Sequence, residues 1–568
     1  MQVKSRKSKD KRYMKKILWL VLTVVGMAAC TEYNAPTNNS GTTDSGSGEA
    51  NDTTNNDVTN QVWSDTLYIS WSGSEATVTG AIDSITVTNE NGYVTINSSV
   101  TRLITYVLSG NGNGQLTIYG AIKHQILLNG LTLTCSDGPA INNQCHKKCY
   151  VVVNGTNSLT DGSSYASSSE DRKAAFFSEG QLIFSGSGSL TVQGNYKHAI
   201  ASDDYIHLTS EAGTFMLNAA SDGLHANDAL YISGGNTSIT AGSDGVQCDS
   251  TITIDGGKLT ISADGDGIQS DTTNIVINGG EITISKAGDK GIVAFGDITI
   301  TDGTIRVNSE YKCLKAGKKE NNTVVSAGSI TISGGDIQAI CSGTSSSGGR
   351  GGWFAPPSGG GPGGGGWGGD SSSDSSSPEA IEAKGTITIS GGYVYAQSSD
   401  DAINAGGDFT VSGGCVCAYS TGNDGMDANG NMYIKGGVVY AIGSSSPEMA
   451  IDANSEGGKK LYVQGGTLVA IGGLESGASL SQSCYQASGS ASTWYAMNVG
   501  NETFAFKTPS SNASKIIVSG ASTPTLYKSV TASGTTIFNG MGYYPATYSG
   551  GSSVSLSTYS ASSGGGRW

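Results

Sequence analysis

The segment S-D-G-V-Q-C-D-S-T-I-T-I-D-G-G-K-L-T-I-S-A, residues 243–263, decides the fold, because its pattern occurs nine times between residues 221 and 470. The period is about 22 residues. Each repeat holds short alternations of β-forming residues that are bounded by Gly, Asp or Asn. Helical repeats are excluded, since Gly recurs too often and no stretch shows a 3.6-residue period. A fixed period of this size predicts a solenoid whose units bury apolar side chains by stacking on their neighbours.

Two columns set the register of the repeat. The first is aliphatic in every repeat: Leu224, Val246, Ile268, Ile292, Leu314, Ile381, Ile403, Met426 and Ile451. The second lies two residues later and holds small residues: Ala226, Cys248, Ser270, Ala294, Ala316, Ala383, Ala405, Ala428 and Ala453. Three short strands per repeat, with paired glycines at a corner, predict an all-β fold, a parallel β-helix of about 22 residues per coil. The crossover rule for parallel strands makes it right-handed.

The chain divides into five predicted regions. Residues 1–30 are a lipoprotein signal peptide with its lipobox, and residues 31–61 a flexible tether rich in Ser, Thr, Asn and Gly. Residues 62–130 are expected to form an N-terminal cap and the first coils. The parallel β-helix follows over 131–475, with a Gly-rich insert at 342–377 that is expected to be disordered. Residues 476–568 are expected to form a C-terminal β cap and a tail.

The first 30 residues indicate export. A basic stretch precedes an apolar one of roughly 13 residues, too short for a comfortable membrane span. Met27-Ala28-Ala29-Cys30 resembles a bacterial lipobox, which implies cleavage before Cys30 and acylation of its sulfur. We therefore expect a protein anchored by lipid to the outer membrane or cell surface. An ordinary secretory peptide and a short membrane anchor are the alternatives.

The charge balance argues against nucleic acid as a partner. The full chain has a net charge of −15. Residues 1–29 carry eight Lys and Arg and one Asp, so cleavage lowers the net charge to −22. An acidic chain without a basic stripe is a poor match for phosphate backbones.

Acidic residues recur two positions before the aliphatic column. Stacking would bring such carboxylates about 5 Å apart, and a bound cation would remove their repulsion. Calcium takes 6–8 oxygen ligands and can bridge adjacent coils. The richest predicted calcium cluster holds Asp400, Asp401, Asn404, Asn423, Asp424, Asp427 and Asp452.

A second predicted calcium cluster combines acidic residues of earlier coils, with Asn227 beside them: Asp222, Asp244, Asp266, Asp249 and Asp271. The alternative for both clusters is that Asp and Asn are good turn residues that hydrogen-bond nearby backbone. Soft ligands are missing from the calcium columns, so zinc and copper are not expected there.

Tyrosines stack in two columns. Tyr433 and Tyr462 share one, and Tyr395 and Tyr440 share another. On outward faces these rings would offer flat platforms on which sugars can rest. The alternative is that tyrosine simply favours surface strands.

No catalytic motif stands out, and no nucleophile pairs clearly with a histidine. Lys290, Lys312 and Lys315 are close in register and are the only candidate bases. A lysine beside calcium could abstract the α-proton of a uronic acid. Several coils and the insert separate these lysines from the first calcium cluster, which weakens this hypothesis.

At these residues the chain resembles exported bacterial β-helix proteins described as calcium-dependent carbohydrate-binding domains, akin to pectate lyases. The likeness spans roughly residues 65–545 and includes Y-V-L-S-G-N-G-N-G-Q-L from Tyr106, the repeat itself and F-A-F-K-T-P from Phe504. In the related lyases an Asp-Asp-Gly-x-Asp stretch holds calcium. Residues 423–427 match it with Asn in the first place, and residues 400–404 with Ala and Asn in the third and last. The lyases' basic catalytic residue has no matching position.

Three functions follow as hypotheses. The first is a surface lipoprotein that binds polysaccharide, without catalysis, on a calcium-bearing face of the β-helix. The second is a calcium-dependent polysaccharide lyase of the pectate type. The third is a structural or adhesive surface protein.

Overall fold

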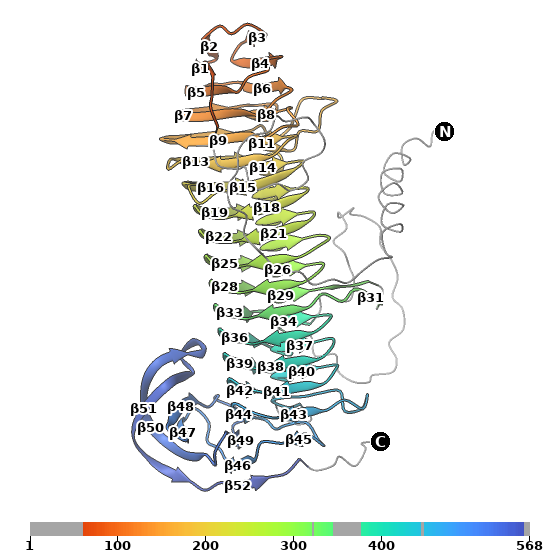
Figure 1. Cartoon of the computed structure of the whole chain (residues 1–568), viewed down its shortest axis with the longest axis vertical. Coiled ribbons are helices and arrows are strands. Elements are labelled where there is room, and N and C mark those ends of the chain that lie inside the picture. Colours follow the sequence, from red (N-terminus) through yellow and green to blue (C-terminus); the bar gives the residue numbers. More distant parts are fainter. Residues whose placement is uncertain (1–60, 321–322, 345–376, 445–447, 562–568) are drawn as a thin grey trace, which may run out of the picture. The chain divides into compact units, whose positions relative to one another are not determined.

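A computed structural model describes residues 61–320, 323–344, 377–444 and 448–561. The predicted signal peptide, the lipidation site Cys30, nearly all of the tether and most of the insert lie outside these residues. The described part is all β, without an α-helix, so it offers no helix that is long and apolar enough to cross a membrane. Long parallel sheets of stacked strands confirm the predicted class (Figure 1).

One coil illustrates how the repeat folds. Strand β20 (Val246–Cys248) is followed by β21 (Thr251–Ile254) and β22 (Lys258–Ala263), and each strand pairs in parallel with its counterpart in the next coil. Val246 lies between Leu224 and Ile268, and all three side chains are fully buried. The aliphatic column is therefore a ladder of the core, as predicted.

The first ladder carries the aliphatic column. Its strands are β4 (Tyr93–Ser98), β6 (Gln115–Gly120), β8 (Ile141–Asn143), β11 (Ala174–Ser178), β14 (His198–Ser202), β17 (Leu224–Ala226), β20, β23 (Ile268–Ser270), β26 (Lys290–Ala294), β29 (Lys312–Ala316), β34 (Glu379–Ala383), β37 (Ile403–Ala405) and β40 (Met426–Ala428). Leu314 pairs with Ile381, so the ladder continues directly across the gap left by residues 345–376. Ile451 extends it beyond Met426.

The second ladder follows the first around each coil. Its strands are β9 (Cys149–Asn154), β12 (Leu182–Ser185), β15 (Tyr205–Leu208), β18 (Ala229–Ile232), β21, β24 (Ile275–Ile277), β27 (Ile298–Ile300), β32 (Ile330–Ile332), β35 (Ile387–Ile389), β38 (Phe409–Val411), β41 (Met432–Ile434), β43 (Leu461–Val463) and β45 (Ser479–Leu480). A short hairpin of β30 (Lys318–Glu320) and β31 (Thr323–Ser326) leaves the stack between the first and second ladders.

The third ladder completes each coil. Its strands are β10 (Thr156–Thr160), β13 (Ser189–Gly194), β16 (Thr214–Ala219), β19 (Asn236–Ala241), β22, β25 (Glu281–Ala287), β28 (Thr304–Ser309), β33 (Asp336–Cys341), β36 (Tyr393–Ser398), β39 (Cys415–Ser420), β42 (Val438–Ile442) and β44 (Thr467–Ile471).

Paired glycines form the corner between the second and third ladders. Gly392 and Gly414 have φ of 78° and 76°, a backbone conformation that disfavours other residues. A Cβ atom on Gly392 would lie 2.6 Å from the carbonyl oxygen of Gly334 in the preceding coil. The corner therefore requires glycine for close stacking as well as for its turn.

Antiparallel pairs stand at the N-terminal end of the stack. They involve β1 (Asp65–Gly73) with β2 (Glu75–Thr79), and β3 (Ile85–Glu90) with β4. The long strands β5 (Ile104–Asn113) and β7 (His124–Thr134) join β1 to the ladders. Trp71 is buried there and donates an indole hydrogen bond to the carbonyl oxygen of Gly92 at 2.8 Å.

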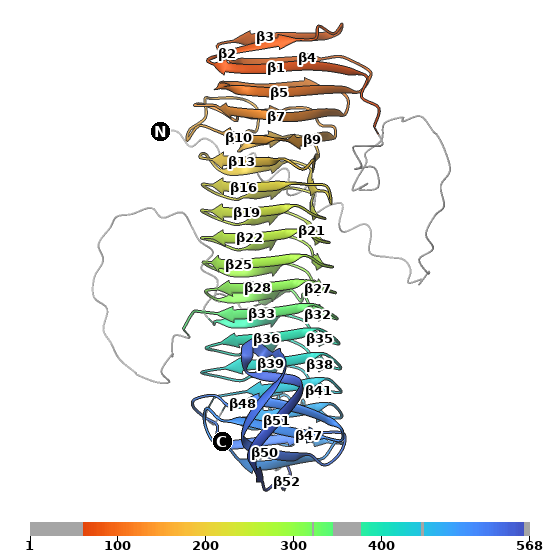
Figure 2. The same ribbon diagram turned by 90° about the vertical axis from the view of Figure 1, so that its left-hand side faces the viewer.

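A closed barrel lies against the third ladder of the last coils, as Figures 1 and 2 show. It consists of β47 (Trp494–Val499), β48 (Glu502–Lys507), β50 (Thr525–Ile537) and β51 (Gly542–Val554), with the 3-10 turn η3 (Phe538–Gly540). Strands β46 (Cys484–Ser488), β49 (Lys515–Ser519) and β52 (Ser557–Tyr559) connect it to the stack, and β49 pairs antiparallel with β44.

Candidate functional site

Asp401 and Asp424 lie in adjacent coils, one before β37 and the other before β40. The backbone N–H of Asp424 donates a hydrogen bond to Oδ1 of Asp401 at 3.0 Å. Beside them, the side-chain amide of Asn423 donates to Oδ1 of Asp400 at 2.7 Å. Residues 23 positions apart in the sequence are therefore in contact, as stacking in register requires.

A second column of ligand-type residues runs parallel to the first. Asn404 pairs with Asp427 across β37 and β40, and Asp452 follows in the next coil. Asp424, Asp427 and Asp452 each offer a carboxylate oxygen, and these three atoms lie within 4.8 Å of one another. The structure thus brings three members of the first predicted cluster within range of a single ion.

The carboxylates of this cluster repel one another. Burial, together with the charge of Asp452, raises the pKa of both Asp424 and Asp427 to about 7. Burial also raises the pKa of Asp401 well above its ordinary value, with Asp427 and Glu379 contributing. A divalent cation would relieve this repulsion, and the donor set consists of hard oxygen atoms that suit calcium.

Glu475 is an acidic member of the site that sequence reasoning missed. Burial, together with a hydrogen bond with Asp452, raises its pKa to about 8. Leu474 pairs with Ile451 and so continues the aliphatic column, which places Glu475 in the column of Asp427 and Asp452. The signal was present in the sequence, since Leu474 follows Ile451 by 23 residues, the spacing that also separates Ile403 from Met426.

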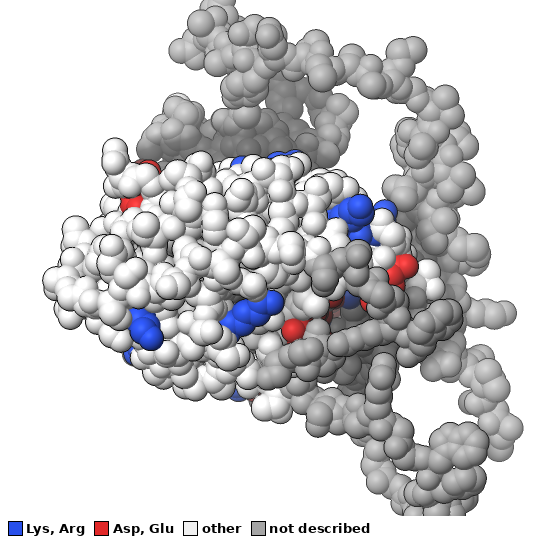
Figure 3. Space-filling view, turned by 90° about the horizontal axis from the view of Figure 1, so that it is seen from below, with Lys and Arg blue, Asp and Glu red and all other residues white. Residues whose placement is uncertain are grey.

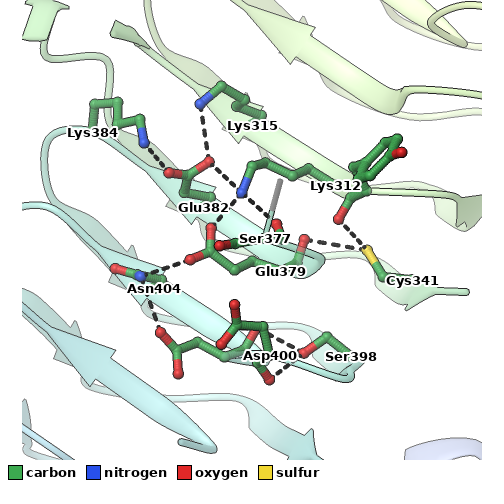
Figure 4. Close-up of polar contacts among 12 residues, drawn as sticks. Lys312, Lys315, Cys341, Ser377, Glu379, Glu382, Lys384, Ser398, Asp400 and Asn404 are labelled. Carbon is green, nitrogen blue, oxygen red and sulfur yellow. Dashed lines mark hydrogen bonds and ion pairs between the residues drawn. The ribbon is translucent and has the colours of Figure 1, made fainter. Parts of the chain in front are cut away.

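Lys312 and Lys315, two of the predicted lysines, lie close to Glu379 and Glu382 (Figure 4). The Nζ atom of Lys312 is 2.6 Å from Oε2 of Glu379 and 3.1 Å from Oε2 of Glu382. Lys315 contacts Glu382 at 2.9 Å, and Lys384 contacts the other oxygen of Glu382. The insert does not separate the lysines from the acidic residues, because β34 pairs directly with β29.

Asn404 joins the lysine network to the acidic cluster. Its amide nitrogen donates to Oε1 of Glu379 at 2.9 Å and to Oδ2 of Asp401 at 3.1 Å. We call the whole surface the polar face of the first ladder: Lys312, Lys315, Glu379, Glu382, Lys384, Asp401, Asn404, Asp424, Asp427, Asp452 and Glu475.

The ion pairs fix the charge states of Lys312 and Glu382. Burial alone would lower the pKa of Lys312, but Glu379 and Glu382 raise it above the ordinary value. Burial alone would raise the pKa of Glu382, but Lys312, Lys315 and Lys384 lower it below the ordinary value. Lys312 is therefore protonated at neutral pH, a state in which it cannot act as a base.

Lys290, the third candidate base, belongs to the preceding coil. It pairs with Lys312 across β26 and β29, and its Nζ atom lies 2.5 Å from Oδ2 of Asp289. It is thus next to the polar face but engaged in an ion pair of its own.

A pocket of about 460 Å³ opens on the polar face. Lys312, Glu379, Glu382 and Asn404 line it, and the β30–β31 hairpin contributes Lys319 and Val324. The lining combines both signs of charge with amides, which suits a hydroxyl-rich ligand better than an apolar one.

The second predicted calcium cluster is not gathered into one group of ligands. Oδ1 of Asp222 accepts the N–H of Asp244 at 3.1 Å, and Oδ1 of Asp244 accepts the N–H of Asp266 at 2.7 Å. Asp249 and Asp271 instead accept hydrogen bonds from the amide of Gln247. Within the described residues these five acids form no group of three in ligand range, and this arrangement favours the alternative role of hydrogen-bonding the backbone.

The two tyrosine columns have different environments. Tyr433 in β41 and Tyr462 in β43 stack with ring centroids 5.1 Å apart and an angle of 9°, and both are partly exposed. The prediction for Tyr395 and Tyr440 was wrong, since both are buried beneath the barrel. Phe504, Phe506 and Phe538 pack on Tyr440, so neither ring of this column can meet a sugar.

A larger groove of about 980 Å³ lies between the glycine corner and the barrel. Its walls include Gly414 and Gly437 on one side, and Tyr544 and Glu502 on the other, with Tyr393 exposed at the edge.

In Figure 3 the described surface seen from below carries its charged side chains as small separate patches on a mostly uncharged background.

Comparison with known proteins gives one similar solved structure and one matching family model. A solved structure titled as the polysaccharide lyase-like protein from C. thermocellum, gadolinium derivative, is 21% identical, covers 49% of this chain and 95% of its own, and has a TM-score of 0.30. No curated protein sequence matches the chain. The family model of carbohydrate-binding domain-containing proteins matches residues 90–294 and 289–425, which together make up more than half of the chain. The chain belongs to that family of carbohydrate-binding domain-containing proteins.

Proposed function

We propose that this protein binds polysaccharide on the polar face of the first ladder, with calcium held by Asp424, Asp427 and Asp452. The observation that carries the proposal is the position of these three carboxylates, within ligand range of one another on the same face as a polar pocket. Membership of a carbohydrate-binding family supports the class of ligand.

Calcium would fit the site because each ligand is an oxygen atom and the acids carry unrelieved repulsion. Bound there, the ion would present open coordination positions to sugar hydroxyl or carboxylate groups. The protein residues would supply the other contacts with the sugar. Glu379, Asn404 and the lysines offer hydrogen bonds in the pocket, and the Tyr433–Tyr462 pair offers a stacking surface in the second ladder.

The charge state of the lysines favours binding without catalysis over a lyase reaction. A lyase base must accept a proton, whereas Lys312 is held charged between Glu379 and Glu382. The same ion pairs would keep the shape of the pocket constant, which favours recognition over chemistry.

The test is a glycan array probed with the full chain in calcium and again in chelator. We expect calcium-dependent binding to a set of polysaccharides, and no unsaturated uronate absorbance on incubation with pectin. Asp427→Asn and Tyr433→Ala should weaken binding, whereas Tyr68→Ala, which removes an exposed tyrosine from β1, should not. Appearance of the uronate absorbance would favour a lyase. Absence of glycan binding under both conditions would favour a structural or adhesive protein.

The location is also a proposal. We propose that the chain is exported and acylated at Cys30, which would tether the polysaccharide-binding face to the outer membrane or cell surface. Labelled palmitate should enter the wild-type protein and not Cys30→Ser. Equal labelling of both would contradict the anchor.

A further inference from the structure

Two histidines and an aspartate from adjacent coils meet outside the polar face. His198 lies at the start of β14, Asp222 precedes β17, and His225 lies within β17. The Nδ1 atoms of His198 and His225 are each 3.0 Å from Oδ2 of Asp222. The two rings are stacked, with centroids 4.1 Å apart. Stacking in register makes this contact, since His198 and Asp222 each stand two residues before the aliphatic column.

The three side chains each bring a possible ligand atom to the same place. A ring nitrogen of each histidine and a carboxylate oxygen of Asp222 lie within 4.8 Å of one another. Zinc binds histidine nitrogen and carboxylate oxygen at about 2.0–2.2 Å, so neighbouring ligands of one ion are separated by roughly 3.0–3.5 Å. The observed 3.0 Å contacts are close to that geometry.

Nδ1 of His198 can either donate a hydrogen bond to the carboxylate of Asp222 or accept one from the backbone N–H of that residue. This Nδ1 atom lies 3.4 Å from the backbone nitrogen of Asp222 and 3.0 Å from Oδ2 of the same residue. A neutral imidazole nitrogen is either a donor or an acceptor. If Nδ1 accepts from the backbone, its lone pair faces a carboxylate oxygen, and a cation between them would turn that repulsion into attraction.

The surroundings orient the carboxylate and shelter the site. Oδ1 of Asp222 accepts the N–H of Asp244 at 3.1 Å and the hydroxyl of Ser221 at 3.2 Å, which leaves Oδ2 directed at the histidines. Such outer contacts hold ligands in place at metal centres. The His198 and Asp222 side chains are 8% and 7% exposed, and His225 is 16% exposed, so the site is sheltered but reachable.

Lys173, a cation close to His198, is already paired. Lys173 contacts Asp203 at 2.6 Å and the side-chain oxygen of Asn227 at 3.4 Å. Its charge is therefore offset, although it lies close enough to His198 to help lower the pKa of that ring, after the larger effect of burial.

We propose that His198, Asp222 and His225 form a binding site for a divalent transition-metal ion of the zinc class, separate from the proposed calcium site. Two imidazole nitrogens select borderline metals over calcium, which prefers oxygen alone. Three protein ligands leave one position for water or another small donor. This second metal would bridge the coils of β14 and β17.

The test uses cobalt(II) as a coloured zinc analogue and the full chain without a histidine tag, in excess calcium. We expect one equivalent of cobalt to give the visible absorption of a low-coordinate nitrogen and oxygen site, and zinc to displace it. Asp222→Asn and His225→Ala should each weaken binding at least tenfold, whereas His146→Ala, which removes an exposed histidine elsewhere, should not. Thermal unfolding of the metal-free variants checks that each is folded.

Two results would overturn the proposal. One is the absence of stoichiometric cobalt binding at micromolar protein in a folded wild-type chain. The other is an affinity of folded His225→Ala equal to that of wild type. Glycan binding does not enter either readout, so failure here is distinguishable from failure of the polysaccharide proposal.

Discussion

The ammonium group of Lys312 lies 2.6 Å from Oε2 of Glu379, although the two residues are 67 positions apart in the sequence. Strand β34, which carries Glu379, pairs directly with β29, which carries Lys312. Both side chains are almost completely buried. Their contact joins the lysines to the acidic end of the polar face.

Removing the charge of Lys312 should destabilise the fold. Lys312→Met leaves Glu379 buried without its cation, and loss of one partner of a buried pair costs about 3–5 kcal/mol. Chemical denaturation would measure the difference. Lys318→Met breaks the exposed pair with Glu320 and should cost less than about 1 kcal/mol. Adding Glu379→Gln to Lys312→Met should restore part of the stability, because Glu382 keeps Lys315 and Lys384; a further loss instead would contradict this account.

The aliphatic column should be sensitive to truncation. Ile403 is fully buried in β37, between Ile381 and Met426, so Ile403→Ala removes apolar contacts and leaves a cavity. We expect a loss of about 2–5 kcal/mol in the free energy of unfolding. Thr410→Ala on the outward side of β38 should change it by less than about 1 kcal/mol. Equal effects of the two substitutions would show that Ile403 is not a core residue.

Calcium should stabilise the chain through the acidic cluster. A ligand present at about a hundredfold excess over its Kd adds about 3 kcal/mol to the free energy of unfolding. We therefore expect the Tm to rise with calcium and to fall with chelator. Asp427→Asn should abolish most of this response, whereas Asp83→Asn, which removes an exposed carboxylate from the N-terminal region, should retain it. A response that survives Asp427→Asn would exclude the proposed site.

Buried His124 should make stability depend on pH. Burial lowers its pKa to about 4, whereas an unfolded histidine has a pKa of about 6.5. As the pH falls, the unfolded chain takes up this proton first. The contribution of His124 is therefore present above about pH 6.5, declines towards pH 4 and amounts to about 3 kcal/mol.

The measurement for His124 is a difference between two proteins. Carboxylates with raised pKa values have the opposite slope, so the wild-type profile alone mixes the two effects. Subtracting the profile of His124→Gln isolates the histidine. Parallel profiles between pH 4 and 7 would mean that His124 has no lowered pKa in the folded protein.

Most of the candidate site could be predicted from the sequence because stacking in register converts sequence period into distance. The repeat alone predicts that Asp401, Asp424, Asp427 and Asp452 lie close together. Glu475 was missed although Leu474 follows Ile451 at the usual spacing, because the rest of the repeat pattern does not continue after it. The contacts of Lys312 were also missed, although the aliphatic column places Ile381 directly after Leu314, because a period does not show which side chains meet.

The histidine cluster could not be predicted from the sequence, for a different reason. His198 and His225 lie 27 positions apart, in the looser coils before and at the start of the regular run. The period predicts that Asp222 stacks near His198, but it does not predict that His225 turns its Nδ1 atom toward the same oxygen. Rotamers follow from local packing, which a repeat pattern does not contain.

The sequence by itself determined the all-β class, the register of the aliphatic column and the stacking of acids on one face, because each depends only on a period repeated many times. Only the tertiary structure decided which outward residues stay exposed. Tyr433 and Tyr440 stand in equivalent alternating patterns, yet the barrel formed by residues far along the chain covers Tyr440 and leaves Tyr433 partly open. Burial of that kind depends on where a distant segment docks, and no local pattern encodes it.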